Sequence, residues 1–196
     1  MKRTFSLIGF LIFTGCATTV LRTVDHAPDF QSGSIRRVLV VSQSQTPARR
    51  RVIEDEFVRQ WQARGVTAVA SYFALEKDTP LDKTHVAPLA KEQGFDTVLV
   101  ARLIGRGKID PHIPTWDFDT EISSAARALS KDYPVLVASP SYAPTYEQAV
   151  VITNVYNVAT EKRIWSGTSQ TLVIDSFPRL VRTYVKEILI SLYQRS

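Results

Sequence analysis

The residue types that most often carry chemistry are scarce in this chain. It has one cysteine, Cys16, and three histidines, His26, His85 and His112. A hydrolase needs a nucleophile held beside a base, or a paired acid and base, in a fixed geometry. Neither a Gly-x-Ser-x-Gly nor a His-Glu-x-x-His pattern occurs in the sequence. We therefore expect that the protein is not an enzyme, and a cell-wall hydrolase ranks last among the candidate functions.

One group of carboxylates has a spacing that could attract a cation. Asp117, Asp119 and Glu121 alternate along the chain, so they would share one side of an extended segment. Calcium-binding loops contain glycine and a fixed loop framework. Neither surrounds these three carboxylates. We predict no metal site and no cofactor.

The chemistry of Cys16 is indicated by the residues before it, which read MKRTFSLIGFLIFTGC. Two cations are followed by an apolar run from Phe5 to Phe13 and by the small Gly15, which is the layout of a secretory signal peptide. The run is too short for a bilayer-spanning helix, which needs roughly 20 residues. A single cysteine also forms no intramolecular disulfide.

This segment resembles the lipobox of bacterial lipoproteins, with Phe13 where that motif usually carries Leu. The resemblance implies that residues 1–15 are removed and that Cys16 becomes a lipidated N-terminus carrying acyl chains such as palmitate. Ala17, in place of Asp, implies an outer-membrane lipoprotein whose domain faces the periplasm. The alternative is an ordinary cleaved signal followed by an incidental cysteine.

The composition of the remaining chain is that of one globular domain. Removal of residues 1–15 leaves 181 of 196, and the full sequence is 44% hydrophobic and 22% charged. Loss of Lys2 and Arg3 lowers the formal net charge from +5 to +3. Because the other basic residues are spread along the chain, we predict no nucleic-acid partner.

The first half of the domain alternates strands and helices. We interpret residues 16–34 as the lipidated cysteine and a flexible tether, and residues 35–196 as a single domain. Strands are predicted at 36–42, 66–71 and 96–103. Two helices connect them, one capped by Thr46 with Pro47 in its first turn and ended by Gly65, the other capped by Thr84 and ended by Gly94. This order is typical of a sheet with helical crossovers.

The second half begins with an irregular insertion at 108–144, rich in proline and aromatic residues. Two β-branched segments follow, 146–158 and 163–173, and predict an antiparallel hairpin. Apolar residues at helical spacing from Phe177 to Leu192 predict a helix packed on the sheet. The predicted fold class is α/β with α+β character: one mixed sheet built as β-α-β-α-β, an insertion, a hairpin and a C-terminal helix.

Two sets of residues are candidate contact sites. Arg49, Arg50 and Arg51 lie in the first turn of a helix, against the preference of its dipole for anions. They are either a contact for an anionic partner or a solvated face. Glu54 and Asp55 lie four residues after Arg50 and Arg51 and can balance part of their charge. The aromatic residues of the insertion either contact a protein or glycan partner or pack back on the domain; they include Trp116, Phe118 and Tyr142.

Two segments resemble a group of small periplasmic α/β domains. LAKEQGFDTVLVARL (Leu89–Leu103) is similar to their helix, turn and apolar strand, and VYNVATEKRIWSGT (Val155–Thr168) to their second hairpin. The group includes the TolB N-terminal domain, the lipoprotein activators of penicillin-binding proteins, the curli-secretion lipoprotein and PelC. The resemblance implies a non-enzymatic binding or assembly lipoprotein that contacts an envelope protein or glycan. The alternative is a homo-oligomeric subunit of an export or secretion assembly.

Overall fold

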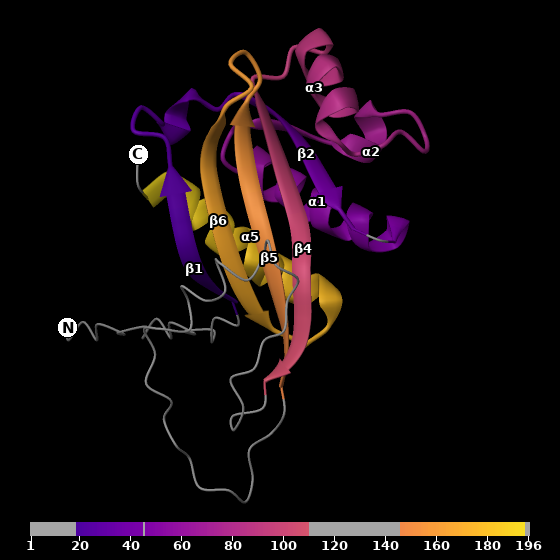
Figure 1. Ribbon diagram of the computed structural model, residues 1–196, viewed down its shortest axis with the longest axis vertical. Helices are drawn as coiled ribbons and strands as arrows, with labels where there is room; N and C mark the ends of the chain where they lie inside the picture. Colours follow the sequence, from indigo (N-terminus) through magenta and orange to yellow (C-terminus); the bar gives the residue numbers. More distant parts are fainter. Residues whose placement is uncertain (1–18, 45, 110–145, 195–196) are drawn as a thin grey trace, which may run out of the picture.

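The protein folds around one mixed six-stranded sheet, which confirms the predicted fold class (Figure 1). The computed structural model describes residues 19–44, 46–109 and 146–194. The strands lie in the order β1-β6-β5-β4-β2-β3. The described elements are β1 (Thr19–His26), a short 3-10 turn (Ser32–Ser34), β2 (Arg37–Gln43), α1 (Pro47–Gln62), β3 (Thr67–Ala70), α2 (Ser71–Ala74), α3 (Lys83–Glu92), β4 (Thr97–Ile109), β5 (Tyr146–Asn157), β6 (Arg163–Leu172) and α5 (Phe177–Gln194).

Strand β2 lies inside the parallel half of the sheet, between β3 and β4. Its successive side chains face opposite cores, as the pleat of a strand requires. Val38 and Val40 pack with α1 and α5, whereas Leu39 and Val41 pack with α3 and the segment around Leu75. The four strand residues are fully buried, which explains why the sequence of this strand is continuously apolar.

The helix ends follow the capping residues of the sequence, with one difference. The Thr46 side chain accepts a hydrogen bond from the Arg49 amide, and Gly65 and Gly94 adopt positive φ angles after α1 and α3, as predicted. The cap of α3 is Asp82 instead of Thr84. Its carboxylate accepts a 3.1 Å hydrogen bond from the amide of His85, so the helix begins two residues earlier than predicted.

Helix α5 packs its apolar face on the sheet beside α1, behind the strands in Figure 1. The ring of Tyr184 meets that of Phe57 edge-on at 5.7 Å between centroids. Its hydroxyl shares a hydrogen bond with that of Thr153 on β5, and burial raises the pKa of the tyrosine well above its usual value. The predicted face of α5 is confirmed, because its buried residues are Leu180, Val181, Tyr184, Val185, Ile188, Leu189 and Leu192.

The predicted flexible tether at residues 16–34 is wrong for residues 19–26, because Thr19–His26 form the edge strand β1, antiparallel to β6. Thr19 is buried and shares a 2.9 Å hydrogen bond with Thr171. Leu21 and Val24 both pack against the main core although three positions separate them. A register irregularity between Leu21 and Thr23 shifts the alternation, so the segment has no regular period that would predict a strand.

The boundaries of the insertion also shift. Strand β4 continues to Ile109 and pairs with β5 from Tyr146 onward, so residues 108 and 109 belong to the sheet. The remainder of the predicted insertion lies outside the described residues. The two ends of this connection lie at the same end of the sheet as the start of β1, since Thr19 pairs with Thr171, Thr171 with Ala149 and Ala149 with Arg106.

A glycine in β6 gives a test of how tightly the main core is packed. A Cβ atom at Gly167 would overlap the ring of Trp165, which is almost fully buried and cannot swing into solvent. We predict that Gly167→Ala lowers the free energy of unfolding by about 1–3 kcal/mol through overpacking. Urea unfolding monitored by circular dichroism measures the loss.

Gly33→Ala is the matched control, because a Cβ there meets no atom within 4 Å. Equal stability of the two variants would contradict the described position of the Trp165 ring.

Candidate functional site

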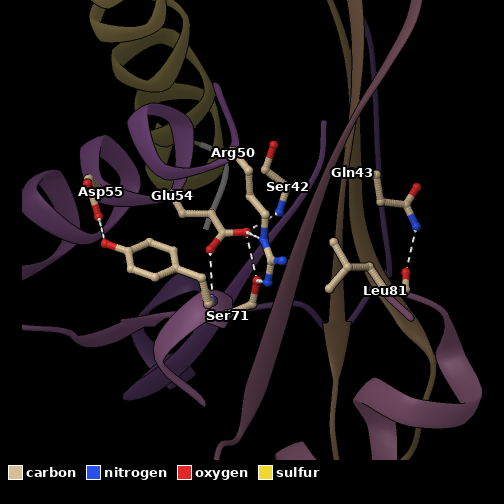
Figure 2. A network of polar contacts seen from close by, with 8 residues as sticks. Ser42, Gln43, Arg50, Glu54, Asp55, Ser71 and Leu81 are labelled. Atoms are coloured by element: carbon tan, nitrogen blue, oxygen red, sulfur yellow. Dashed lines mark hydrogen bonds and ion pairs between the residues drawn. The ribbon is translucent and has the colours of Figure 1, made fainter. Parts of the chain in front are cut away.

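The three arginines in the first turn of α1 have three separate environments and do not form one anion-binding cluster. Arg50 turns toward the protein (Figure 2): its Nε donates to Glu54 Oε1 at 3.0 Å and its terminal nitrogen to Ser71 Oγ at 2.7 Å. The predicted ion pair between Arg50 and Glu54 is thus confirmed. Arg49 and Arg51 are exposed.

Both exposed arginines lie over aromatic rings. The guanidinium of Arg49 is 5.5 Å from the ring centre of Phe177, and that of Arg51 is 5.3 Å from the ring centre of Tyr72. Asp55 does not pair with Arg51 but accepts a hydrogen bond from the Tyr72 hydroxyl. Partial burial and this carboxylate raise the pKa of Tyr72 to about 12.

The carboxylate of Glu54 is fully buried and is surrounded by donors. Besides Arg50 it accepts hydrogen bonds from the amide of Ser42 at 2.8 Å, from Ser71 Oγ at 2.7 Å and from the amide of Tyr72 at 3.3 Å. These groups come from the end of β2, from α1 and from the start of α2. Glu54 therefore holds three elements together where β2 ends, and its oxygen atoms are engaged in the fold.

Two cavities flank this end of β2, one on each face of the sheet. The α3 cavity, of about 360 Å³, lies between α3 and the strands, and Gln43 donates across it to the carbonyl of Leu81 (Figure 2). Its wall carries charges of both signs: Asp82, Lys83, Arg102 and Glu161. Lys83 and Glu161 form an ion pair of 2.9 Å across it.

The second cavity, the α1/α5 groove, has about 330 Å³ and lies between those helices and the opposite face of the sheet. Most of its wall is apolar, and the charged residues that border it in the described part of the chain are cationic. The wall residues are Ser42, Gln43, Ser44, Arg49, Ile53, Ala101, Arg102, Leu103, Ala149, Val151, Thr171, Val173, Phe177, Leu180, Val181 and Tyr184. A groove of this kind can hold an apolar group with an anionic end.

One cluster contains the residue types of a catalytic triad but has the geometry of a helix cap. Asp82 accepts from Thr84 Oγ1 at 2.6 Å and lies 2.8 Å from His85 Nδ1, and the same ring nitrogen faces Thr84 Oγ1 at 3.1 Å. A relay needs one imidazole nitrogen on the acid and the other on the nucleophile. The hydrogen bonds from Thr84 and then His85 lower the pKa of Asp82 to about 2, as expected of a capping carboxylate.

The remaining predicted site residues are placed as follows. Cys16, Trp116, Phe118 and Tyr142 lie outside the described residues. Within the described ranges, no group of three or more His, Cys, Asp or Glu side chains is arranged to hold a metal ion. None of the helices in the described part of the chain is long and apolar enough to cross a membrane.

The sequence analysis predicts neither the α1/α5 groove nor the Glu54 network, although the sequence contains one signal for the network. Glu54 lies three residues before Phe57 and seven before Trp61, on the apolar face of α1. A carboxylate in such a position must be paired when it is buried. The groove had no comparable signal, because residues distant in sequence form its wall.

Comparisons with solved structures agree with the predicted fold group. The chain is similar to PelC from Paraburkholderia phytofirmans, which was solved as a dodecamer, with a TM-score of 0.50 and 13% identity over 91% of this chain and 99% of that one. It is less similar to lipoprotein GNA1162 from Neisseria meningitidis, with a TM-score of 0.45 and 14% identity over 81% and 99% of the two chains. No protein-family model and no curated protein sequence matches the chain. At this identity the likeness to PelC shows a shared fold.

The Glu54 network predicts a strong effect of a nearly isosteric substitution. Glu54→Gln removes the charge that pairs with Arg50 and places an amide nitrogen among donors. We expect the free energy of unfolding to fall by about 3 kcal/mol, as for the loss of one partner of a buried ion pair. Asp55→Asn, at the exposed neighbouring position, should cost less than about 1 kcal/mol. Equal losses in denaturant unfolding would contradict the role of Glu54.

Proposed function

We propose that this chain is a lipoprotein of the outer membrane, anchored through Cys16, whose periplasmic domain binds or assembles with an envelope partner and catalyses no reaction. The observation that carries the proposal is the position of the lipobox relative to the fold. The first strand begins at Thr19, three positions after Cys16. Cleavage before Cys16 would therefore remove no described element of the domain.

The short connection favours a domain held close to the membrane. Three residues span at most about 11 Å when fully extended. The end of the sheet that carries the start of β1 would thus lie next to the lipid leaflet. Because the ends of the 110–145 connection share this end of the sheet, a partner bound there would also be close to the membrane.

A binding role agrees with the polar groups of the described residues. The buried carboxylate of Glu54 is engaged by four donors, and the histidine beside Asp82 takes part in a helix cap. Neither group is positioned as a general base beside a nucleophile. The fold shared with PelC agrees with the same role, since PelC was solved as an assembly of twelve copies.

Anchoring is tested on the mature protein isolated from membranes. We predict that mass spectrometry finds an N-terminal Cys16 with acyl chains and without residues 1–15. The Cys16→Ser variant should lose the lipid mass and leave the membrane fraction. An unmodified Cys16 in the mature wild-type chain would contradict the proposal.

The aromatic residues of the insertion remain our proposed partner contact. We predict that replacing Trp116 and Phe118 together with Ala weakens capture of the partner in cross-linking within intact envelopes, while the thermal unfolding midpoint stays unchanged. Tyr142→Ala should act in the same direction. A large fall in the midpoint would instead assign these side chains to the core of the domain.

The second candidate function is a subunit of a homo-oligomeric export assembly. It is favoured by the dodecameric state in which the structural neighbour PelC was solved. Light scattering on the chain without its lipid separates the two candidates. A monomer favours the binding lipoprotein, and a discrete ring of many copies favours the assembly subunit.

A further inference from the structure

The α1/α5 groove exposes apolar surface that is continuous with the main core. Leu103 is 44% exposed, and Ile53, Val151 and Phe177 are only partly buried although they pack against the core. Below them, Ala101 and Val181 are buried and close the floor of the groove. Apolar surface of this kind on a folded domain is typical of a binding site. A volume of about 330 Å³ is also within the range of small-ligand sites, roughly 300–1,000 Å³.

The charges of the groove wall are of one sign. Arg49 lines it, and no Asp or Glu does among the described residues. Arg102 also borders it, but its side chain follows those of Val98 and Val100 to the α3 face of the sheet. Among the described residues Arg49 forms no ion pair, and its guanidinium stays at the surface over the Phe177 ring. The α3 cavity differs, because its wall contains Asp82 and the Lys83–Glu161 pair. The electrostatic complement of the groove is thus an apolar body with an anionic end.

We propose that the α1/α5 groove binds a free fatty acid, with its alkyl chain on the apolar wall and its carboxylate at Arg49. Arginine suits this role because its guanidinium binds carboxylates with paired hydrogen bonds. Alkyl chains gain free energy from each methylene that leaves water. The groove thereby has one chemical class of ligand, distinct from the protein or glycan partner of the proposed function.

The place of the groove in the fold brings it near a source of such ligands. Thr171 lines the groove and shares a hydrogen bond with Thr19. The three residues from Cys16 to Thr19 span at most about 11 Å when fully extended. This step rests on the proposed lipid anchor, whereas the apolar wall and Arg49 do not depend on it. A domain held at the leaflet would meet fatty acids at high local concentration.

The test uses a chain that begins at Ala17, which retains every described element. Titration with the fluorescent fatty acid cis-parinaric acid should show saturable binding of one molecule per chain with a micromolar Kd. The methyl ester of the same acid should bind roughly tenfold more weakly, because it lacks the charge that Arg49 attracts. Absence of saturable binding by the acid would overturn the proposal. So would equal affinity for acid and ester.

Matched variants locate the site. Leu103→Glu places an anion on the groove wall and should weaken binding at least tenfold, whereas Ile174→Glu, at a similarly exposed position outside the groove, should not. Arg49→Gln should weaken binding, and Arg51→Gln, on the same helix over Tyr72, should leave it unchanged. Circular dichroism confirms that each variant is folded. Equal effects of the groove and control variants would overturn the assignment.

Two further arms separate the other possible occupants. If the Ala17 chain binds the probe but the lipidated chain does not, the groove belongs to the acyl chain of Cys16, and the free ligand is overturned. If binding appears only when residues 110–145 are replaced by a short Gly-Ser linker, that segment covers the groove, and the proposal is again overturned. Binding by all three forms supports it. The lipid anchor is tested separately, by the mass of the N-terminal Cys16, and a failure of the fatty-acid tests would not change that result.

Discussion

The pairing of β1 with β6 is the constraint that sets how this protein can sit at a membrane. Its register joins Thr19 to Thr171 and places the start of β1 at the end of the sheet where β6 finishes. Because Cys16 lies only three residues earlier, the fold itself fixes where an N-terminal lipid would emerge. A flexible tether of 18 residues would have allowed the domain to move far from the membrane. The edge strand removes most of that freedom.

Much of the fold could be predicted from the sequence because local signals and long-range packing agree. The continuous apolar run of β2, the Thr46-Pro47 start of α1 and the stripe of α5 each indicate the observed element. Strand β1 was missed because its register shift hides the alternation that predicts strands. The α1/α5 groove could not be predicted at all, since its wall combines Arg49, Leu103 and Phe177 from separate elements.

Near the end of β2, a polar group that is hydrogen-bonded within the fold lies apart from a charged group that has no acidic partner among the described residues. Glu54 lies in the apolar face of α1, and its carboxylate is bonded to backbone amides, a hydroxyl and Arg50. These contacts stabilise the junction of β2, α1 and α2, and they engage the oxygen atoms of Glu54 in the fold. Arg49, by contrast, carries charge beside apolar surface without an acidic partner among the described residues. The buried network thus stabilises the fold, whereas the groove is the proposed ligand-binding site.

The most direct test of the membrane geometry is the distance from each end of the sheet to the lipid surface. A lipidated Cys16 has no free thiol, so a fluorophore can be attached to a new cysteine at exposed Val20 or at exposed Ala159 in the β5–β6 turn. The mature chain in liposomes with headgroup quenchers is then measured by fluorescence. We predict strong quenching at position 20 and little at position 159. Equal quenching at the two positions, or stronger quenching at 159, would contradict the proposed orientation.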